Sequence, residues 1–171
     1  MFWNWQWNST WYPNLDQVIK DLKEEENIRV TAYITPHLNI DGGIFQENAE
    51  SSNYWLKNSD SDETLFQDFG EFNVSTVDII EQDPECNCIN TARIWYKDLI
   101  KSNLIDLGMS GWMADFGEYT PLFGKTSFNG RWWNEESAEI LHGFLPGDWA
   151  SLNREAVEEA GKLGNYRQHP K

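Results

Sequence analysis

Two copies of the tetrapeptide Asp-Phe-Gly-Glu, at residues 68–71 and 115–118, carry carboxylates that could do chemistry. A carboxylate fixed beneath an acetal carbon can act as nucleophile or stabilise a cationic transition state, with a second carboxyl group as acid. Residues 108–114 are small or apolar, which predicts a buried parallel strand whose carboxyl end carries Asp115 into the mouth of a barrel. From spacing alone, this catalytic role and a loop-capping role for Asp115 are about equally favoured.

The setting of the first copy favours a structural role instead. Asp68 follows the polar and mixed stretch 62–67, and its neighbours Phe69 and Phe72 are expected to pack within an excursion between a strand and a helix. The metal-binding DFG of a protein kinase is excluded, because a kinase would carry a glycine-rich phosphate loop, a strand lysine and a His-Arg-Asp loop before it. None of these is present in the sequence.

The elements that must position Asp115 alternate between strands and helices, a pattern typical of parallel β/α units in a doubly wound sheet or a barrel. A complete eight-unit barrel needs about 250 residues. The 171-residue chain is therefore expected to be a partial (β/α)8 TIM barrel, residues 1–171 being a fragment of one catalytic domain.

Asn14 is the expected cap of the first helix and Gly108 the expected end of the third. Apolar periodicity predicts strands over residues 2–7, 28–36, 74–80 and 109–116, and helices over 14–26, 45–57, 92–107 and 136–162.

Composition excludes several classes of protein. With 13 basic and 28 acidic residues, the chain repels phosphate backbones and anionic membrane surfaces, so neither nucleic acid nor membrane is an expected partner. Residues 1–8 lack the basic start and apolar run of a signal peptide, and no segment has the length of a membrane span. Cys86 and Cys88, one residue apart, suit neither a disulfide framework nor a four-ligand zinc site.

Residues 111–119, Gly-Trp-Met-Ala-Asp-Phe-Gly-Glu-Tyr, resemble the nucleophile-strand motif of glycoside hydrolase family 31, in the branch represented by sulfoquinovosidases. The resemblance covers nearly the whole chain. Further segments that are similar to family segments in the same order are residues 2–17, 32–38, 68–72, 137–146 and 152–164.

This resemblance implies a retaining α-glycosidase without metal or organic cofactor, whose partner is a small carbohydrate: an α-sulfoquinovoside first, an α-glucoside second. Asp115 matches the family's catalytic nucleophile. Trp112 and Glu118 belong to the same motif and are candidate substrate-binding residues, as is Trp3, which matches a tryptophan at the sulfonate end of the pocket. From the residues alone, Trp3 has a second interpretation that is at least as favoured, as part of an aromatic core face formed by residues 2–7.

The chain also departs from the family pattern. The family's acid/base is an aspartate on a later barrel strand, expected beyond Lys171, and a sulfonate-binding arginine is expected just before Trp3. The carboxylates Asp41, Glu71 and Asp78 lie near expected strand ends, but nothing in the sequence places one at the separation of about 5 Å that retention requires. A competing class is therefore a non-hydrolytic carbohydrate-binding relic or an incomplete reading frame. An open half-barrel would expose strand edges and is expected to aggregate.

Three other features have weaker predictions. His37, just after a strand, could reach the barrel mouth and touch substrate, although a loop histidine that only hydrogen-bonds to the backbone is commoner. His142 is predicted to be a packed core residue on an apolar helix face. The aromatic loop of residues 123–133 is expected to cover neighbouring strands rather than to stack on a sugar ring.

Overall fold

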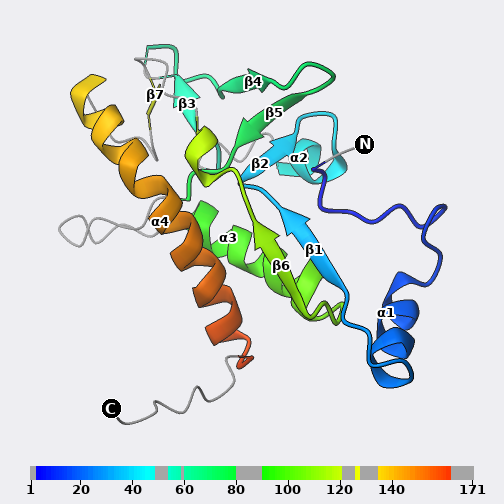
Figure 1. The fold of residues 1–171 in the computed structure, drawn as a ribbon. Helices are drawn as coiled ribbons and strands as arrows, with labels where there is room; N and C mark the ends of the chain where they lie inside the picture. Colours follow the sequence, from blue (N-terminus) through cyan, green and yellow to red (C-terminus); the bar gives the residue numbers. More distant parts are fainter. Residues whose placement is uncertain are drawn as a thin grey trace, which may run out of the picture.

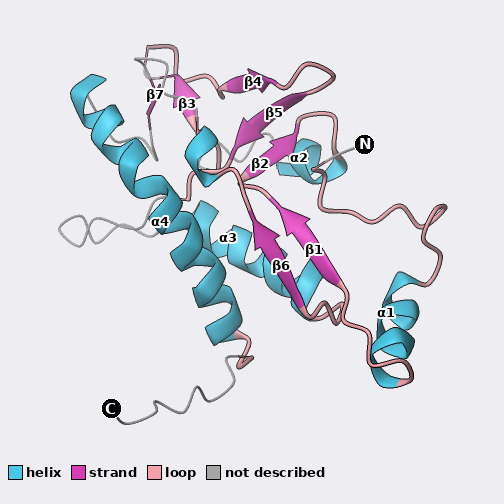
Figure 2. Ribbon diagram, viewed as in Figure 1, coloured by secondary structure: helices cyan, strands magenta, loops and turns pink. Residues whose placement is uncertain are grey.

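The computed structural model describes residues 3–48, 54–58, 60–79, 90–120, 126–127 and 135–162, without the side chains of 126–127 and 135–141. Cys86, Cys88 and most of the aromatic loop lie outside these ranges. Figure 2 shows the helical elements α1 (Leu15–Glu24), α2 (Gly43–Asn48), α3 (Thr91–Ile100), the π-helical turn η1 (Lys101–Ile105), the 3-10 turn η2 (Gly117–Tyr119) and α4 (Glu135–Glu159). The strands are β1 (Thr31–Ile34), β2 (His37–Asn39), β3 (Lys57–Asn58), β4 (Phe66–Asp68), β5 (Asn73–Thr76), β6 (Gly111–Ala114) and β7 (Thr126–Ser127).

The predicted strand–helix alternation is confirmed for β1, α3, β6 and α4. β1 and β6 pair in parallel with Thr31 opposite Gly111 and Ile34 opposite Ala114. In Figure 1 the two strands lie side by side and point the same way, while α3, which precedes β6 in sequence, and α4 pack beside them. Within the described part of the chain no third strand joins this pair.

The strand predicted over residues 74–80 is present at β5, but it is not a parallel barrel strand. It pairs antiparallel with β2 on one side and β4 on the other, in the order β2-β5-β4. The second sheet lies beyond the carboxyl end of β1 (Figure 1). The cause is the short connection from β1 to β2 at Pro36: the chain enters an antiparallel excursion before it reaches α3.

The strand predicted over residues 2–7 is wrong for the residues that the structure describes. Trp3 and Trp5 have φ angles of 54° and 58°, in the left-handed region, so the segment cannot be pleated. The indole of Trp5 donates to the hydroxyl oxygen of Tyr96 at 3.1 Å, whereas Trp7 is exposed. The alternate tryptophans therefore do not form one continuous core face.

The predicted helix ends are partly confirmed. Asn14 precedes α1 but has a left-handed backbone and no side-chain capping bond; its carbonyl accepts from the amide of Val18. Gly108 has φ 93° and ends the helix after η1, as predicted. Helix α4 continues through Pro146. None of the helices in the described ranges is long and apolar enough to cross a membrane.

The described core lies between the strands and the pair α3 and α4. Tyr96 of α3 is fully buried, packs against Trp149 of α4 and donates from its hydroxyl to the carbonyl of Thr35. Burial raises the pKa of Tyr96, so the hydroxyl remains a donor. This contact ties both helices to the end of β1. Other large side chains of the same core are Ile34, Leu38, Trp55, Val77, Ile79, Ile100, Leu145 and Leu152.

A buried guanidinium joins α3 to α4. Arg93 donates to the carbonyls of Ile79 at 2.7 Å and Asp148 at 3.2 Å, and it pairs with Glu155 through both carboxylate oxygens, the shorter contact being 2.6 Å. Ser151 also donates to Glu155. Because one planar guanidinium satisfies two carbonyls and a carboxylate, it fixes the separation of the two helices.

Acid is expected to weaken this helix pair. Partial burial opposes ionisation of Glu155, but the hydrogen bonds from Arg93 and Ser151 outweigh it and lower the pKa of Glu155 from 4.5 to about 2. A depressed carboxyl pKa adds stability that is present above pH 4.5 and is lost as the pH falls towards about 2. Over this interval the thermal midpoint should fall further in the wild type than in Arg93→Met. Equal falls would show that Glu155 contributes no such stability.

Candidate active site

Asp115 lies directly after β6, and its backbone is held by the neighbouring strand. The amide of Ser110 donates to Val30 at 2.8 Å where the pair begins, and the amide of Asp115 donates to Ile34 at 2.9 Å where it ends. Strand alternation then sends the Asp115 side chain to the same face as Met113. The predicted position of Asp115, at the carboxyl end of a parallel strand, is confirmed.

The strand that carries Asp115 is less buried than predicted. Met113 is 61% exposed, and its register partner Tyr33 on β1 is 46% exposed. The opposite face of both strands packs on the core through Ile34 and Trp112. The strand pair therefore has one face against the helices and one face that no described element covers.

The open face brings Tyr33 and Asp115 together. The Tyr33 hydroxyl donates to Oδ2 of Asp115 at 2.5 Å. Desolvation, the hydrogen bond to Asp115, and the charges of Asp115 and Glu118 together raise the pKa of Tyr33 from 10.0 to about 12. Glu118, itself exposed, acts on this hydroxyl only through its charge, as the smallest of these effects.

The turn after Asp115 is fastened to α4. Phe116 has φ 62°, which is uncommon for a residue with a side chain, and Gly117 packs so closely that an added Cβ would lie 2.9 Å from Cδ1 of Trp149. His142 of α4 makes a 2.8 Å hydrogen bond to the carbonyl of Glu118. The prediction that His142 is a packed core residue is therefore wrong, because its ring is half-buried and holds this turn.

Trp3 lies beside the residue that follows the candidate nucleophile. Its ring centroid is 5.3 Å from that of Phe116 and 5.1 Å and 5.4 Å from those of Phe69 and Phe72. It also stacks with His37 at 6.0 Å. The structure thus places Trp3 in an aromatic cluster at the edge of the Asp115 site. Trp3 does not lie in a strand.

The two Asp-Phe-Gly-Glu copies meet in this cluster, where the rings of Phe69 and Phe116 are 6.2 Å apart. In the first copy, Asp68 is exposed and accepts a 2.7 Å hydrogen bond from the amide of Gly70, which has φ 88°. That carboxylate shapes a turn between β4 and β5, and Phe69 supplies packing. The structural role predicted for the first copy agrees with this geometry.

His37 does not reach the open face. It is fully buried in β2, and its Nδ1 is 2.8 Å from the hydroxyl oxygen of Thr76. Burial lowers the pKa of His37 to about 4, with a smaller opposing effect from the backbone of Phe116. A neutral imidazole among Trp3 and its aromatic neighbours serves packing, and its bond to a side chain of β5 differs from the loop contact to backbone that was the other expectation.

Trp112 lies on the wrong face of β6 to meet Asp115. Its indole donates to Oδ1 of Asn153 on α4 at 2.7 Å, and the Asn153 amide donates to the carbonyl of Trp149. Of the four predicted site residues, Asp115 and Glu118 lie on the same turn after β6, Trp3 lies beside that turn against Phe116, and Trp112 belongs to the contact between sheet and helix.

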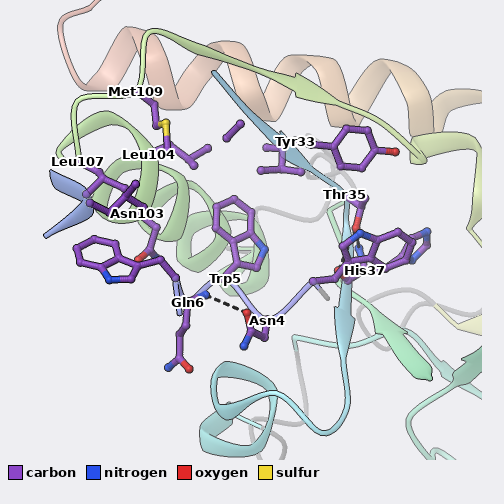
Figure 3. A pocket seen from close by; sticks show the side chains of 15 residues that line it. Asn4, Trp5, Gln6, Tyr33, Thr35, His37, Asn103, Leu104, Leu107 and Met109 are labelled. Carbon is purple, nitrogen blue, oxygen red and sulfur yellow. Dashed lines mark hydrogen bonds between the residues drawn. The ribbon is translucent and has the colours of Figure 1, made fainter. Parts of the chain in front are cut away.

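A cavity of about 210 Å³ lies along the free edge of β1, between the N-terminal segment and the end of η1 (Figure 3). Trp3, Tyr33 and His37 border it, but Asp115 does not line it. Its other walls are mostly apolar, so we do not assign a glycoside to this space. They include Trp5, Leu15, Ile34, Leu104, Leu107 and Met109.

Tyr33 is the site residue that the sequence did not indicate. The expected strand 28–36 contained it, but only the register that sets Tyr33 opposite Met113 puts its hydroxyl within reach of Asp115. The available signal in the sequence was a tyrosine near the end of the expected strand, at a position where its side chain would point away from the core. That signal is uninformative until the neighbouring strand is known.

The comparisons with known proteins agree with this geometry. Residues 1–165 match the model of the glycosyl hydrolases family 31 TIM-barrel domain. The chain is 42% identical over 164 residues to the sulfoquinovosidase of Escherichia coli (strain K12), and 39% identical over 165 residues to that of Agrobacterium fabrum; 96% of the chain aligns with each. It belongs to glycoside hydrolase family 31.

A solved structure extends the likeness to three dimensions. A family 31 sulfoquinovosidase from E. rectale, in complex with the aza-sugar inhibitor IFGSQ, superposes with a TM-score of 0.78 at 36% identity over 95% of this chain. The chain spans 22% of the length of that protein and 22% of each curated relative. The fold is therefore part of a family 31 TIM barrel, as predicted.

Proposed function

We propose that the natural protein that carries this chain is a retaining α-glycosidase with Asp115 as its nucleophile. The supporting observation is the Asp115 carboxylate at the carboxyl end of β6, where Tyr33 holds Oδ2 and no described residue donates a hydrogen bond to Oδ1. Oδ1 is thus the oxygen with a lone pair available for attack. Membership in family 31 supports the same role for this residue.

The chemistry follows from that carboxylate. Oδ1 attacks the anomeric carbon and forms an ester bond while the glycosidic C–O bond breaks, and the departing oxygen takes a proton from a carboxylic acid. The resemblance to the family assigns that acid to an aspartate on a later barrel strand. Water then attacks the anomeric carbon and gives a proton to the conjugate base of that acid. The ester C–O bond breaks, its electron pair returns to Asp115, and the sugar is released with its original anomeric configuration.

For the substrate, we propose an α-sulfoquinovoside ahead of an α-glucoside. The two curated relatives and the E. rectale protein are all sulfoquinovosidases. Trp3, braced by Phe69 and Phe116 beside Asp115, provides an apolar wall for the sugar end. Glu118 is proposed to accept hydrogen bonds from sugar hydroxyl groups.

A non-hydrolytic carbohydrate-binding protein is the competing candidate. The partly exposed Trp3 favours it, because an aromatic face can bind a sugar ring without any contribution from Asp115. In a glycosidase the Asp115 carboxylate is required for turnover. In a binding protein there is no turnover, and the carboxylate has no catalytic role.

The proposed function is tested with the natural protein at its full length and two chromogenic substrates, nitrophenyl α-sulfoquinovoside and nitrophenyl α-glucoside. Nitrophenol release should be faster from the sulfoquinovoside, and proton NMR should detect the α-anomer as the first sugar product. No release from either substrate, or the β-anomer as first product, would contradict a retaining α-glycosidase.

A further inference from the structure

We propose that Tyr33 is the positioning residue of Asp115, aiming Oδ1 at the anomeric carbon and stabilising the carboxylate when it leaves the glycosyl-enzyme. This inference rests on the proposed function, because it assigns Tyr33 a part in the reaction of Asp115. It adds a residue outside the 111–119 motif, from a different strand.

The geometry supports this role in two ways. The hydroxyl donates to one carboxylate oxygen only, at 2.5 Å, which fixes rotation of the carboxylate about its last bond and leaves Oδ1 without a partner among the described residues. The aromatic ring of Tyr33 packs edge-on against Phe116 at 6.3 Å, so the donor itself is held. The exposed face on which both groups lie is the face that a substrate can approach.

The surroundings of Tyr33 keep its hydroxyl protonated, so that it remains a hydrogen-bond donor. Desolvation and the hydrogen bond to Asp115 raise its pKa to about 12, and the charges of Asp115 and Glu118 act in the same direction. Its hydroxyl therefore stays protonated at any pH where the enzyme would work. A protonated hydroxyl can stabilise the Asp115 anion but cannot itself accept a proton from it.

The two steps of the reaction should use this hydrogen bond unequally. In the first step Asp115 loses negative charge as its ester forms. The hydrogen bond from Tyr33 to Oδ2 then helps to orient the carboxylate but does not become stronger. In the second step the ester C–O bond breaks and negative charge returns to the carboxylate, where the hydrogen bond strengthens. Loss of the hydroxyl should therefore slow release of the sugar more than formation of the intermediate.

The test compares Tyr33→Phe with Tyr12→Phe, which removes an exposed hydroxyl distant in sequence from the site, in the natural full-length protein. Tyr33→Phe should lower kcat by roughly 10- to 100-fold, since a hydrogen bond to a charged group is lost. The ratio kcat/KM should fall less, and a burst of aglycone release with a covalent adduct of the enzyme should appear. Tyr12→Phe should resemble the wild type.

Unchanged kinetics in Tyr33→Phe, or an equal fall in kcat and kcat/KM without adduct, would overturn the proposal. A second measurement does not need activity: ultraviolet titration of Tyr33, taken as the difference from Tyr33→Phe, should show its pKa falling from about 12 towards 10.0 in an Asp115→Asn background. No fall would also overturn it. If the pKa falls but Asp115→Asn retains turnover, the proposed function fails, and the positioning role fails with it, even though the contact exists.

Discussion

Replacing Asp115 with asparagine in the natural protein should lower kcat by roughly 10⁴-fold or more, the scale of losses when an essential nucleophile is removed. An amide has nearly the shape of the carboxylate but supplies no anionic oxygen to form the ester. Tyr33 can still donate to the amide oxygen, and the side chain is partly exposed, so the fold should survive. Initial rates on the nitrophenyl glycosides measure this loss.

The second tetrapeptide copy provides a matched control. Asp68→Asn changes the same residue type in the same four-residue sequence, but this carboxylate accepts a hydrogen bond from the Gly70 amide on an exposed turn. Its kcat should stay close to wild type. Equal losses in both variants would contradict a special role of Asp115, whereas sugar affinity without turnover in the wild type would favour the carbohydrate-binding alternative.

The largest expected effect on stability is at Arg93. Arg93→Met keeps much of the side-chain volume but leaves the carbonyls of Ile79 and Asp148 without this donor and deprives Glu155 of its bidentate partner. Removing one member of a mostly buried pair should lower the free energy of local unfolding by about 2 kcal/mol, since Lys97 still pairs with Glu155. Hydrogen exchange of α3 and α4 amides should accelerate about 30-fold.

Arg154→Met is the control for that change. Arg154 is exposed on α4 and pairs with Glu158 one turn further on, at 2.7 Å. Such a fully exposed pair is screened by solvent and contributes little, so exchange should hardly change. If Arg154→Met accelerates exchange as much as Arg93→Met, the buried guanidinium does not hold the two helices together.

The sequence predicted those parts of the fold that are determined by residues close together along the chain. The apolar run before Asp115 gave the strand and its end, and Gly108 gave the preceding turn, because only the local backbone and composition matter there. The family resemblance of residues 111–119 then indicated Asp115 as the candidate nucleophile. The partial barrel followed from strand–helix alternation, which β1, α3, β6 and α4 display.

Features decided by contacts between distant residues were not predicted. The tryptophans of residues 2–7 alternate like a strand, yet Trp3 packs on rings of the excursion and Trp5 on Tyr96, and these contacts hold the backbone in left-handed conformations. Trp112 shares the motif of Asp115 but faces the helices, since adjacent strand residues point to opposite faces. The contact of Tyr33 with Asp115 likewise depends on a parallel register that no local pattern specifies.

The most direct test of the central claim is to trap the covalent intermediate. With a 5-fluoro-α-glycosyl fluoride, the ring fluorine slows both steps by destabilising their cationic transition states. The anomeric fluoride is a good leaving group that speeds only the first step, so the glycosyl-enzyme forms faster than water releases it. Incubated with the natural protein, it should add one glycosyl group, and peptide mass spectrometry should locate that group on Asp115. A label on Asp68 or on any other residue, or an active enzyme that acquires no label, would contradict Asp115 as the nucleophile.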